Sequence, residues 1–198
     1  MNKCPFLGRC GGCKFDFVAD DYRENKIKTL PILTLSDSPI WIAPGIRRRG
    51  DFCFAGGEFG LFESGTKNII PITTCPNMAP EINAILPELS KLPWTGSGAC
   101  LVTLCDNGID VNINSSVPYV TPEFRRACAN IPVIRITWND NIIFAKTEPV
   151  VSFGNKTIKY SPGAFLQPTI DGADILRDMV VRAAMGAKRV ADLFCGLG

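Results

Sequence analysis

Apolar and polar residues alternate through most of the middle of the chain, and turn-forming residues separate the alternating runs. A period of two is typical of strands with one buried face, and Gly-Gly or Asn-Gly between two such runs is typical of a hairpin. The pattern therefore predicts four antiparallel hairpins, at residues 52–62, 101–114, 134–145 and 150–160.

A helical period interrupts this pattern in four places. The spacing of apolar residues predicts helices over residues 18–30, 79–91, 122–130 and 170–184. Thr121 followed by Pro122 is a favourable start for the third helix, and Gly186 is a favourable stop for the fourth. The apolar face of the fourth helix is expected to comprise Ile175, Leu176, Met179 and Val180.

The end of the chain differs in character from the middle. Residues 189–194 are predicted to form a short buried strand, and the glycine-rich turn 195–198 follows it. A helix, a strand and a glycine turn in this order open a parallel α/β sheet. Because a single strand cannot bury both faces of such a sheet, we expect the segment 151–198 to be poorly stable by itself.

The composition narrows the classes of protein. The chain has 198 residues, 46% hydrophobic and 20% charged, with a net charge of +2. These values are typical of a globular protein without a strong overall field toward nucleic acid. No apolar run is long enough for a membrane span, and the N-terminus lacks an apolar leader, so we expect a reducing, cytoplasmic setting. The absence of histidine excludes any Cys-His or Ser-His catalytic pair.

Four cysteines form the strongest candidate site. Cys4, Cys10 and Cys13 lie within thirteen glycine-rich residues, and Cys75 stands before a proline further along the chain. We call these four residues the cysteine cluster. An iron–sulfur centre accommodates three neighbouring ligands and one distant ligand, and Cys-Pro also ends ferredoxin motifs. A structural zinc site and ordinary buried thiols are the alternatives, although zinc sites usually pair two C-x2-C motifs or use histidine.

The remaining cysteines favour simpler interpretations. Four of them lie in apolar or strand contexts and are expected to be buried, unreactive thiols: Cys53, Cys100, Cys105 and Cys128. Cys195 lies in the glycine turn, where a small side chain fits.

Four stretches together resemble the S-adenosylmethionine-dependent RNA 5-methyluridine methyltransferases, above all the iron–sulfur members that modify large-subunit ribosomal RNA. The cysteine cluster is similar to the family's cluster ligands. Residues 45–49 resemble its Tyr-Arg-Asn-Arg segment, with Arg47 and Arg49 in register and Arg48 in place of asparagine. Residues 161–167 resemble its Phe-x-Gln motif, and residues 192–198 resemble its cofactor-binding motif I.

The resemblance implies roles for particular residues. Cys4, Cys10, Cys13 and Cys75 would hold a 4Fe-4S cluster. Gln167, Phe194 and Gly196 would contact S-adenosylmethionine. The arginines at 47–49 could contact RNA phosphates, and a solvated charge cluster is the alternative. The implied reaction is methylation of uridine C5 in ribosomal RNA, without a membrane partner.

The resemblance also implies an organisation of the chain. We expect an α+β protein with an iron–sulfur arm at residues 1–35, a β-rich central domain at 36–150 and the start of a Rossmann-like methyltransferase domain at 151–198. The family's OB-like domain would be absent. Its nucleophilic cysteine and its general base lie beyond motif I, so no catalytic residue is assigned and the chain is expected to be truncated and inactive alone. The alternatives are an iron–sulfur RNA-binding module or half of a split enzyme with a separately encoded C-terminal half.

Overall fold

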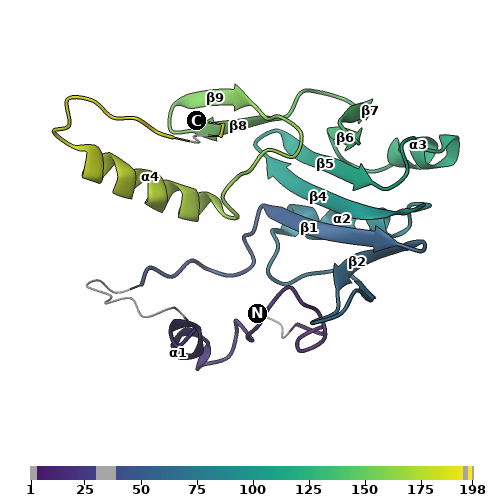
Figure 1. The fold of residues 1–198 in the computed structure, drawn as a ribbon, viewed down its shortest axis with the longest axis horizontal. Helices are drawn as coiled ribbons and strands as arrows, with labels where there is room; N and C mark the ends of the chain where they lie inside the picture. Colours follow the sequence, from purple (N-terminus) through teal and green to yellow (C-terminus); the bar gives the residue numbers. More distant parts are fainter. Residues whose placement is uncertain (1–3, 30–38, 194–195, 198) are drawn as a thin grey trace.

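A computed structural model describes residues 4–29, 39–193 and 196–197. Short turns join most of the elements, and α3 comes between two strands of one sheet in chain order while lying beyond the strand ends in space (Figure 1). The helices are α1 (Tyr22–Ile27), α2 (Pro80–Ser90), α3 (Pro122–Cys128) and α4 (Ile170–Ala184). The strands are β1 (Arg49–Ala55), β2 (Glu58–Phe62), β3 (Ile69–Pro71), β4 (Ser97–Cys105), β5 (Gly108–Ser115), β6 (Arg135–Trp138), β7 (Asn141–Ala145), β8 (Val150–Phe153) and β9 (Lys156–Lys159).

Within the described residues, seven strands form one sheet in the order β3-β2-β1-β4-β5-β6-β7, and β8 and β9 form a separate hairpin. The four predicted hairpins are confirmed as β1–β2, β4–β5, β6–β7 and β8–β9. The sequence did not predict strand β3, nor the parallel pairing of β5 with β6. Because α3 lies between these two strands, the chain returns in the same direction and the sheet is mixed.

Turn chemistry fixes the register of the hairpins. Gly56 and Gly57 have φ of +60° and +86°, and Asn139 and Asp140 have φ of +45° and +64°. Positive φ at both central residues matches the twist of a two-residue hairpin, and Gly, Asn and Asp adopt it most readily. Once β1 and β2 pair in this register, Phe52 and Phe54 project from the same face of the sheet.

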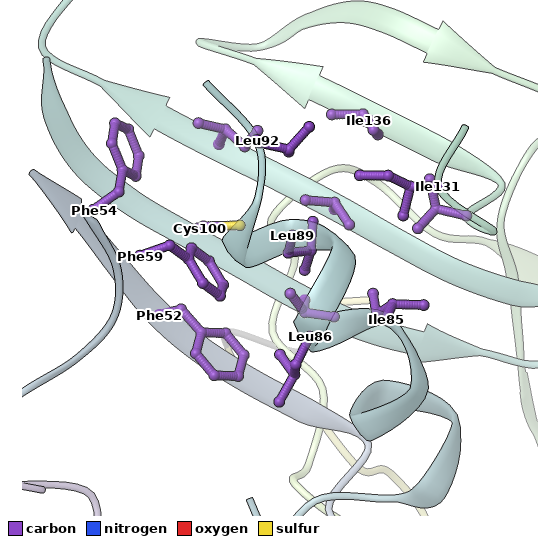
Figure 2. Packing of buried hydrophobic residues seen from close by; sticks show 14 of the residues in the cluster. Phe52, Phe54, Phe59, Ile85, Leu86, Leu89, Leu92, Cys100, Ile131 and Ile136 are labelled. Carbon is purple, nitrogen blue, oxygen red and sulfur yellow. The ribbon is translucent and has the colours of Figure 1, made fainter. Parts of the chain in front are cut away.

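The main core lies between that face and α2 (Figure 2). The ring centroids of Phe54 and Trp94 are 4.5 Å apart, and those of Phe59 and Trp94 are 5.3 Å apart. Each large apolar side chain buried in this way contributes about 1.5–3 kcal/mol. Helix α2 packs here through residues at helical spacing, namely Ile82, Ile85, Leu86 and Leu89.

The opposite face of the sheet carries a buried polar network beneath β8 and β9. Arg135 Nε donates to Asp110 Oδ1 at 2.6 Å, and Arg135 NH2 donates to the Tyr160 carbonyl at 3.0 Å. The Tyr160 hydroxyl in turn donates to the Ala164 carbonyl at 2.7 Å. The network therefore fixes the loop that follows β9, which contains Gln167.

Three helix predictions agree with the structure. Helix α4 has the predicted bounds, and α2 and α3 lie within the predicted ranges. At the start of α3, Thr121 Oγ1 accepts a hydrogen bond from the Phe124 N–H at 3.1 Å. The apolar face of α4 differs from a core-packed face, because no residue of α4 is buried.

Two predictions at the ends of the chain are corrected. The N-terminal helix comprises only Tyr22–Ile27, since Asp21 makes no side-chain cap and turns precede it; Leu30 lies outside the described residues. Residues 189–193 are exposed and form no strand, because no described strand pairs with them. Along the described ranges, no helix combines the length and the apolar character that crossing a membrane requires.

Candidate functional site

The N-terminal cysteine segment is attached along the end of β2. The Gly11 N–H donates to the Phe62 carbonyl at 2.8 Å, and the Ser64 N–H donates to the Arg9 carbonyl at 2.8 Å. Tight turns bend the segment between these contacts, and within one of them the Gly12 N–H donates to Cys10 Sγ at 3.3 Å. These bonds hold Cys10 and its neighbours against the sheet, as their glycine-rich sequence permits.

The cysteine cluster surrounds one cavity of about 180 Å³. Cys4, Cys10 and Cys13 reach it from the N-terminal segment, and Cys75 reaches it from the segment that precedes α2. Much of the remaining wall is apolar, with Phe6, Leu61, Ile72 and Met78. The fold thus brings a residue sixty positions away in the sequence to the three N-terminal cysteines.

Asn83, in the second turn of α2, holds the Cys75 segment. Its Oδ1 accepts from the Cys75 N–H at 2.7 Å, and its Nδ2 donates to the Cys75 carbonyl at 3.0 Å and to the Met78 carbonyl at 3.1 Å. Sequence reasoning missed this residue, because a single asparagine on a helix gives no specific signal.

The environment of the cluster disfavours several free thiolates together. Burial raises the pKa of Cys13, and the neighbouring charges of Cys75, Cys10 and Cys4 raise it further. Burial also raises the pKa of Cys75, opposed by hydrogen bonds from the backbone N–H groups of Asn77 and Met78. Both shifts favour the neutral thiol forms of Cys13 and Cys75 when no cation is bound. Within the described ranges, no group of three or more Cys, Asp or Glu side chains is placed so that it could hold a metal ion.

Gln167 lies on the loop after β9 that the polar network holds in place. Arg48 makes two further hydrogen bonds to this loop. Arg48 Nε donates to the Gln167 carbonyl at 3.1 Å, and the Arg48 N–H donates to the Pro168 carbonyl at 2.7 Å. The Gln167 side chain is half-buried and lines a second cavity, of about 1150 Å³, together with Cys13. The candidate cofactor residue and one member of the cysteine cluster therefore border the same cavity.

The other two candidate cofactor residues give less information. Gly196 has φ of +62°, a conformation that glycine adopts without strain. Phe194 lies outside the described residues, as does Cys195.

The three arginines at 47–49 occupy different environments. Arg48 is buried, and burial lowers its pKa, so it does not present its charge to phosphate as the sequence suggested. Arg49 stacks on the Phe165 ring at 5.1 Å. Arg47 lines both cavities, and its Nε is buried without a hydrogen-bond partner among the described residues. Nothing in the sequence separates these three roles, because all three positions are arginine.

The four thiols predicted to be structural are buried. Burial raises the pKa of Cys53 to about 11 and the pKa values of Cys105 and Cys128 to about 12, and it also raises that of Cys100. A nucleophilic cysteine needs accessible thiolate near neutral pH. None of these four is suited to nucleophilic catalysis.

Comparison with known sequences identifies relatives along almost the whole chain. An uncharacterized RNA methyltransferase of Mesorhizobium japonicum is 32% identical over 214 residues, which cover 98% of this chain and 52% of the relative. A 23S rRNA (uracil(1939)-C(5))-methyltransferase, RlmD, of Shewanella piezotolerans is 27% identical over 236 residues, which cover 98% of this chain and 52% of the relative. No protein-family model matches the chain.

Among solved structures, the tRNA (uracil-54, C5)-methyltransferase of Pyrococcus abyssi in complex with S-adenosyl-L-homocysteine has a similar fold. Its TM-score is 0.55 at 13% identity, over 70% of this chain and 40% of that chain. The chain spans about half the length of the curated relatives that it matches. Its homologues are RNA methyltransferases, some of them named as uracil-C5 methyltransferases of 23S rRNA.

Proposed function

We propose that this chain takes part in S-adenosylmethionine-dependent methylation of uridine C5 in RNA, with ribosomal RNA as the substrate class. The similarity to RNA methyltransferases over 98% of the chain carries the proposal. The fold similarity to a tRNA uracil-C5 methyltransferase in complex with S-adenosyl-L-homocysteine supports the same chemistry.

The described residues fit a binding and positioning role in this reaction. Gln167 would contact the cofactor, which supplies the methyl group when bound, and Arg48 and the Tyr160 hydroxyl hold the loop that carries Gln167. Uridine C5 methylation also needs a thiolate that adds to C6 and a base that removes the C5 proton. The buried thiols Cys53, Cys100, Cys105 and Cys128 do not suit that nucleophilic role.

We further propose that the cysteine cluster holds a 4Fe-4S cluster. Four cysteines line one cavity, and the chain has no histidine to complete a mixed zinc site, which supports an all-cysteine group. Because the side chains of the described residues are not placed to hold a metal ion, the N-terminal segment would have to bring its sulfur atoms closer together when the cluster binds. When bound, the cluster would supply a covalent link between the N-terminal segment and the segment before α2. That role is architectural, and the cysteines then act as ligands in the thiolate form.

Deletion of the gene tests the reaction. In the organism that encodes the chain, the deletion should remove a 5-methyluridine from ribosomal RNA, and the intact gene should restore it. Unchanged 5-methyluridine in all ribosomal RNA of the deletion strain would refute the proposed function.

Metal analysis of protein purified without oxygen tests the cluster. Iron and acid-labile sulfide in equal amounts are expected in the wild type, with a large loss in Cys75→Ser. Cys128→Ser is the matched control, since Cys128 is buried in α3 away from the cavity. Stoichiometric zinc without iron or sulfide would show a zinc site instead.

A further inference from the structure

The second cavity is lined by basic and aromatic side chains, and by no acidic ones among the described residues. It is formed by the N-terminal segment with α1, the chain before β1, and α4 along its length from Gly172 to Arg182, and we call it the interarm groove. Figure 1 shows α1 and α4 on the same side of the large sheet, with the chain that leads into β1 between them. Its volume of about 1150 Å³ is slightly above the ~300–1,000 Å³ of typical small-molecule pockets.

The charge of the groove is of one sign. Its cationic lining residues are Lys14, Arg23, Lys26, Arg47 and Arg182. Among the described residues that line it there is no Asp or Glu, although the whole chain has 19 acidic residues against 21 basic ones. A concave surface with only positive charge attracts a polyanion and raises its local concentration.

Aromatic rings stand among these cations. Trp41 is half-buried, with the Arg23 guanidinium over its ring at 5.4 Å and the Tyr22 ring edge-on at 6.1 Å. Both contacts fix the indole ring, so that little conformational entropy is lost when a ligand stacks on it. Nucleic-acid bases stack on aromatic rings and on guanidinium planes, while lysine and arginine neutralise the phosphates.

We propose that the interarm groove binds unpaired RNA, with bases stacked at Trp41 and phosphates held by Arg23 and Lys26. The choice of RNA as the polymer rests on the proposed function. Gln167 and Cys13 also line the groove, which therefore borders both candidate sites. A paired strand would keep its bases inside the duplex and could not use the aromatic surface.

Fluorescence anisotropy with the full chain tests this inference. The probe is a labelled single-stranded RNA of about 12 nucleotides, within the ~4–16-nucleotide sites of single-strand-binding folds. Trp41→Ala should weaken binding about tenfold, the effect of one lost stacking contact. Tyr119→Ala is the matched control, because Tyr119 is an exposed aromatic residue that does not line the groove, and it should bind within about twofold of wild type.

Two double variants that each lose two positive charges give a second measurement, the salt dependence of RNA affinity, which does not depend on Trp41. Arg23→Gln with Lys26→Gln should lower the slope of log affinity against log salt by about 1.4, the value for two phosphate contacts to a single strand. Lys67→Gln with Lys156→Gln removes the same charge from exposed positions outside the groove and should leave the slope unchanged.

Several outcomes would overturn the inference. The first two are an RNA affinity of Trp41→Ala equal to that of the wild type, and salt slopes that are equal for the two double variants. The other two are an affinity for duplex RNA equal to that for the single strand, and tighter binding of an acidic peptide than of RNA. Unchanged ribosomal 5-methyluridine after gene deletion, with the expected variant effects, would refute only the proposed function. Loss of that methylation without the variant effects would refute only the groove.

Discussion

Replacing Asn83 by alanine should loosen the Cys75 segment and lower the free energy of unfolding. The amide of Asn83 makes three short hydrogen bonds, two with the backbone of Cys75 and one with the Met78 carbonyl. Each such bond contributes about 1 kcal/mol net, which gives about 3 kcal/mol for the group. Alanine has the higher helix propensity by about 0.6 kcal/mol, so we expect a net loss of about 2 kcal/mol.

Urea unfolding of the metal-free protein, followed by tryptophan fluorescence, measures this loss. Glu88→Ala is the control on the same helix, since it removes only an exposed ion pair with Lys91 and should cost under about 0.5 kcal/mol. The iron bound after reconstitution should fall in Asn83→Ala and remain in Glu88→Ala. A loss below about 0.5 kcal/mol in Asn83→Ala would show that the three bonds do not hold the Cys75 segment.

Three further predictions concern the sheet and the loop after β9. Burial raises the pKa of Cys128 to about 12 from its ordinary 9.0, so the folded state keeps the proton that the unfolded state loses, and stability should fall as the pH rises above about 9. The loss of unfolding free energy between pH 9 and pH 10, measured by urea unfolding, should be smaller in Cys128→Ala than in the wild type by about 1 kcal/mol. An equal loss in the two proteins would refute the raised pKa of Cys128. Gly60→Ala would bring a methyl group into collision with the Ile70 carbonyl oxygen and should lower the free energy of unfolding by about 3 kcal/mol. A urea midpoint close to that of the wild type would contradict this expectation. Arg48→Met removes the hydrogen bond to Gln167 and should speed amide exchange in residues 161–168 about tenfold by mass spectrometry, whereas unchanged exchange would show that other contacts fix the loop.

The sequence predicted the antiparallel hairpins because their information is local. Alternation identifies a strand, and residues such as Asn139 and Asp140 identify the turn that joins it to the next strand. The pairing of β5 with β6 and the short strand β3 depend on contacts between distant segments, which no local pattern records. The same limit explains residues 189–193, where an apolar run alone does not make a strand.

The candidate site shows a similar division. The spacing of the N-terminal cysteines singled them out, and the structure places all four cluster cysteines at one cavity. The partners that hold them and Gln167, such as Asn83 and Arg48, are ordinary residues whose roles arise only when α2, β1 and the loop after β9 come together. Three neighbouring arginines likewise differ in burial, because alternate residues of an extended chain face opposite sides.

The two residues that precede β1, Arg47 and Arg48, connect the segments that carry the two candidate sites. The Arg47 N–H donates to the Asn77 carbonyl and the Arg47 carbonyl accepts from the Ala79 N–H, while Arg48 bonds Leu104 and Pro168 in the same way. Consecutive residues are therefore attached to the Cys75 segment and to the Gln167 loop. Because a hinge between the two would have to break at least two of these backbone bonds, the segments should open together in amide exchange, as a single cooperative unit.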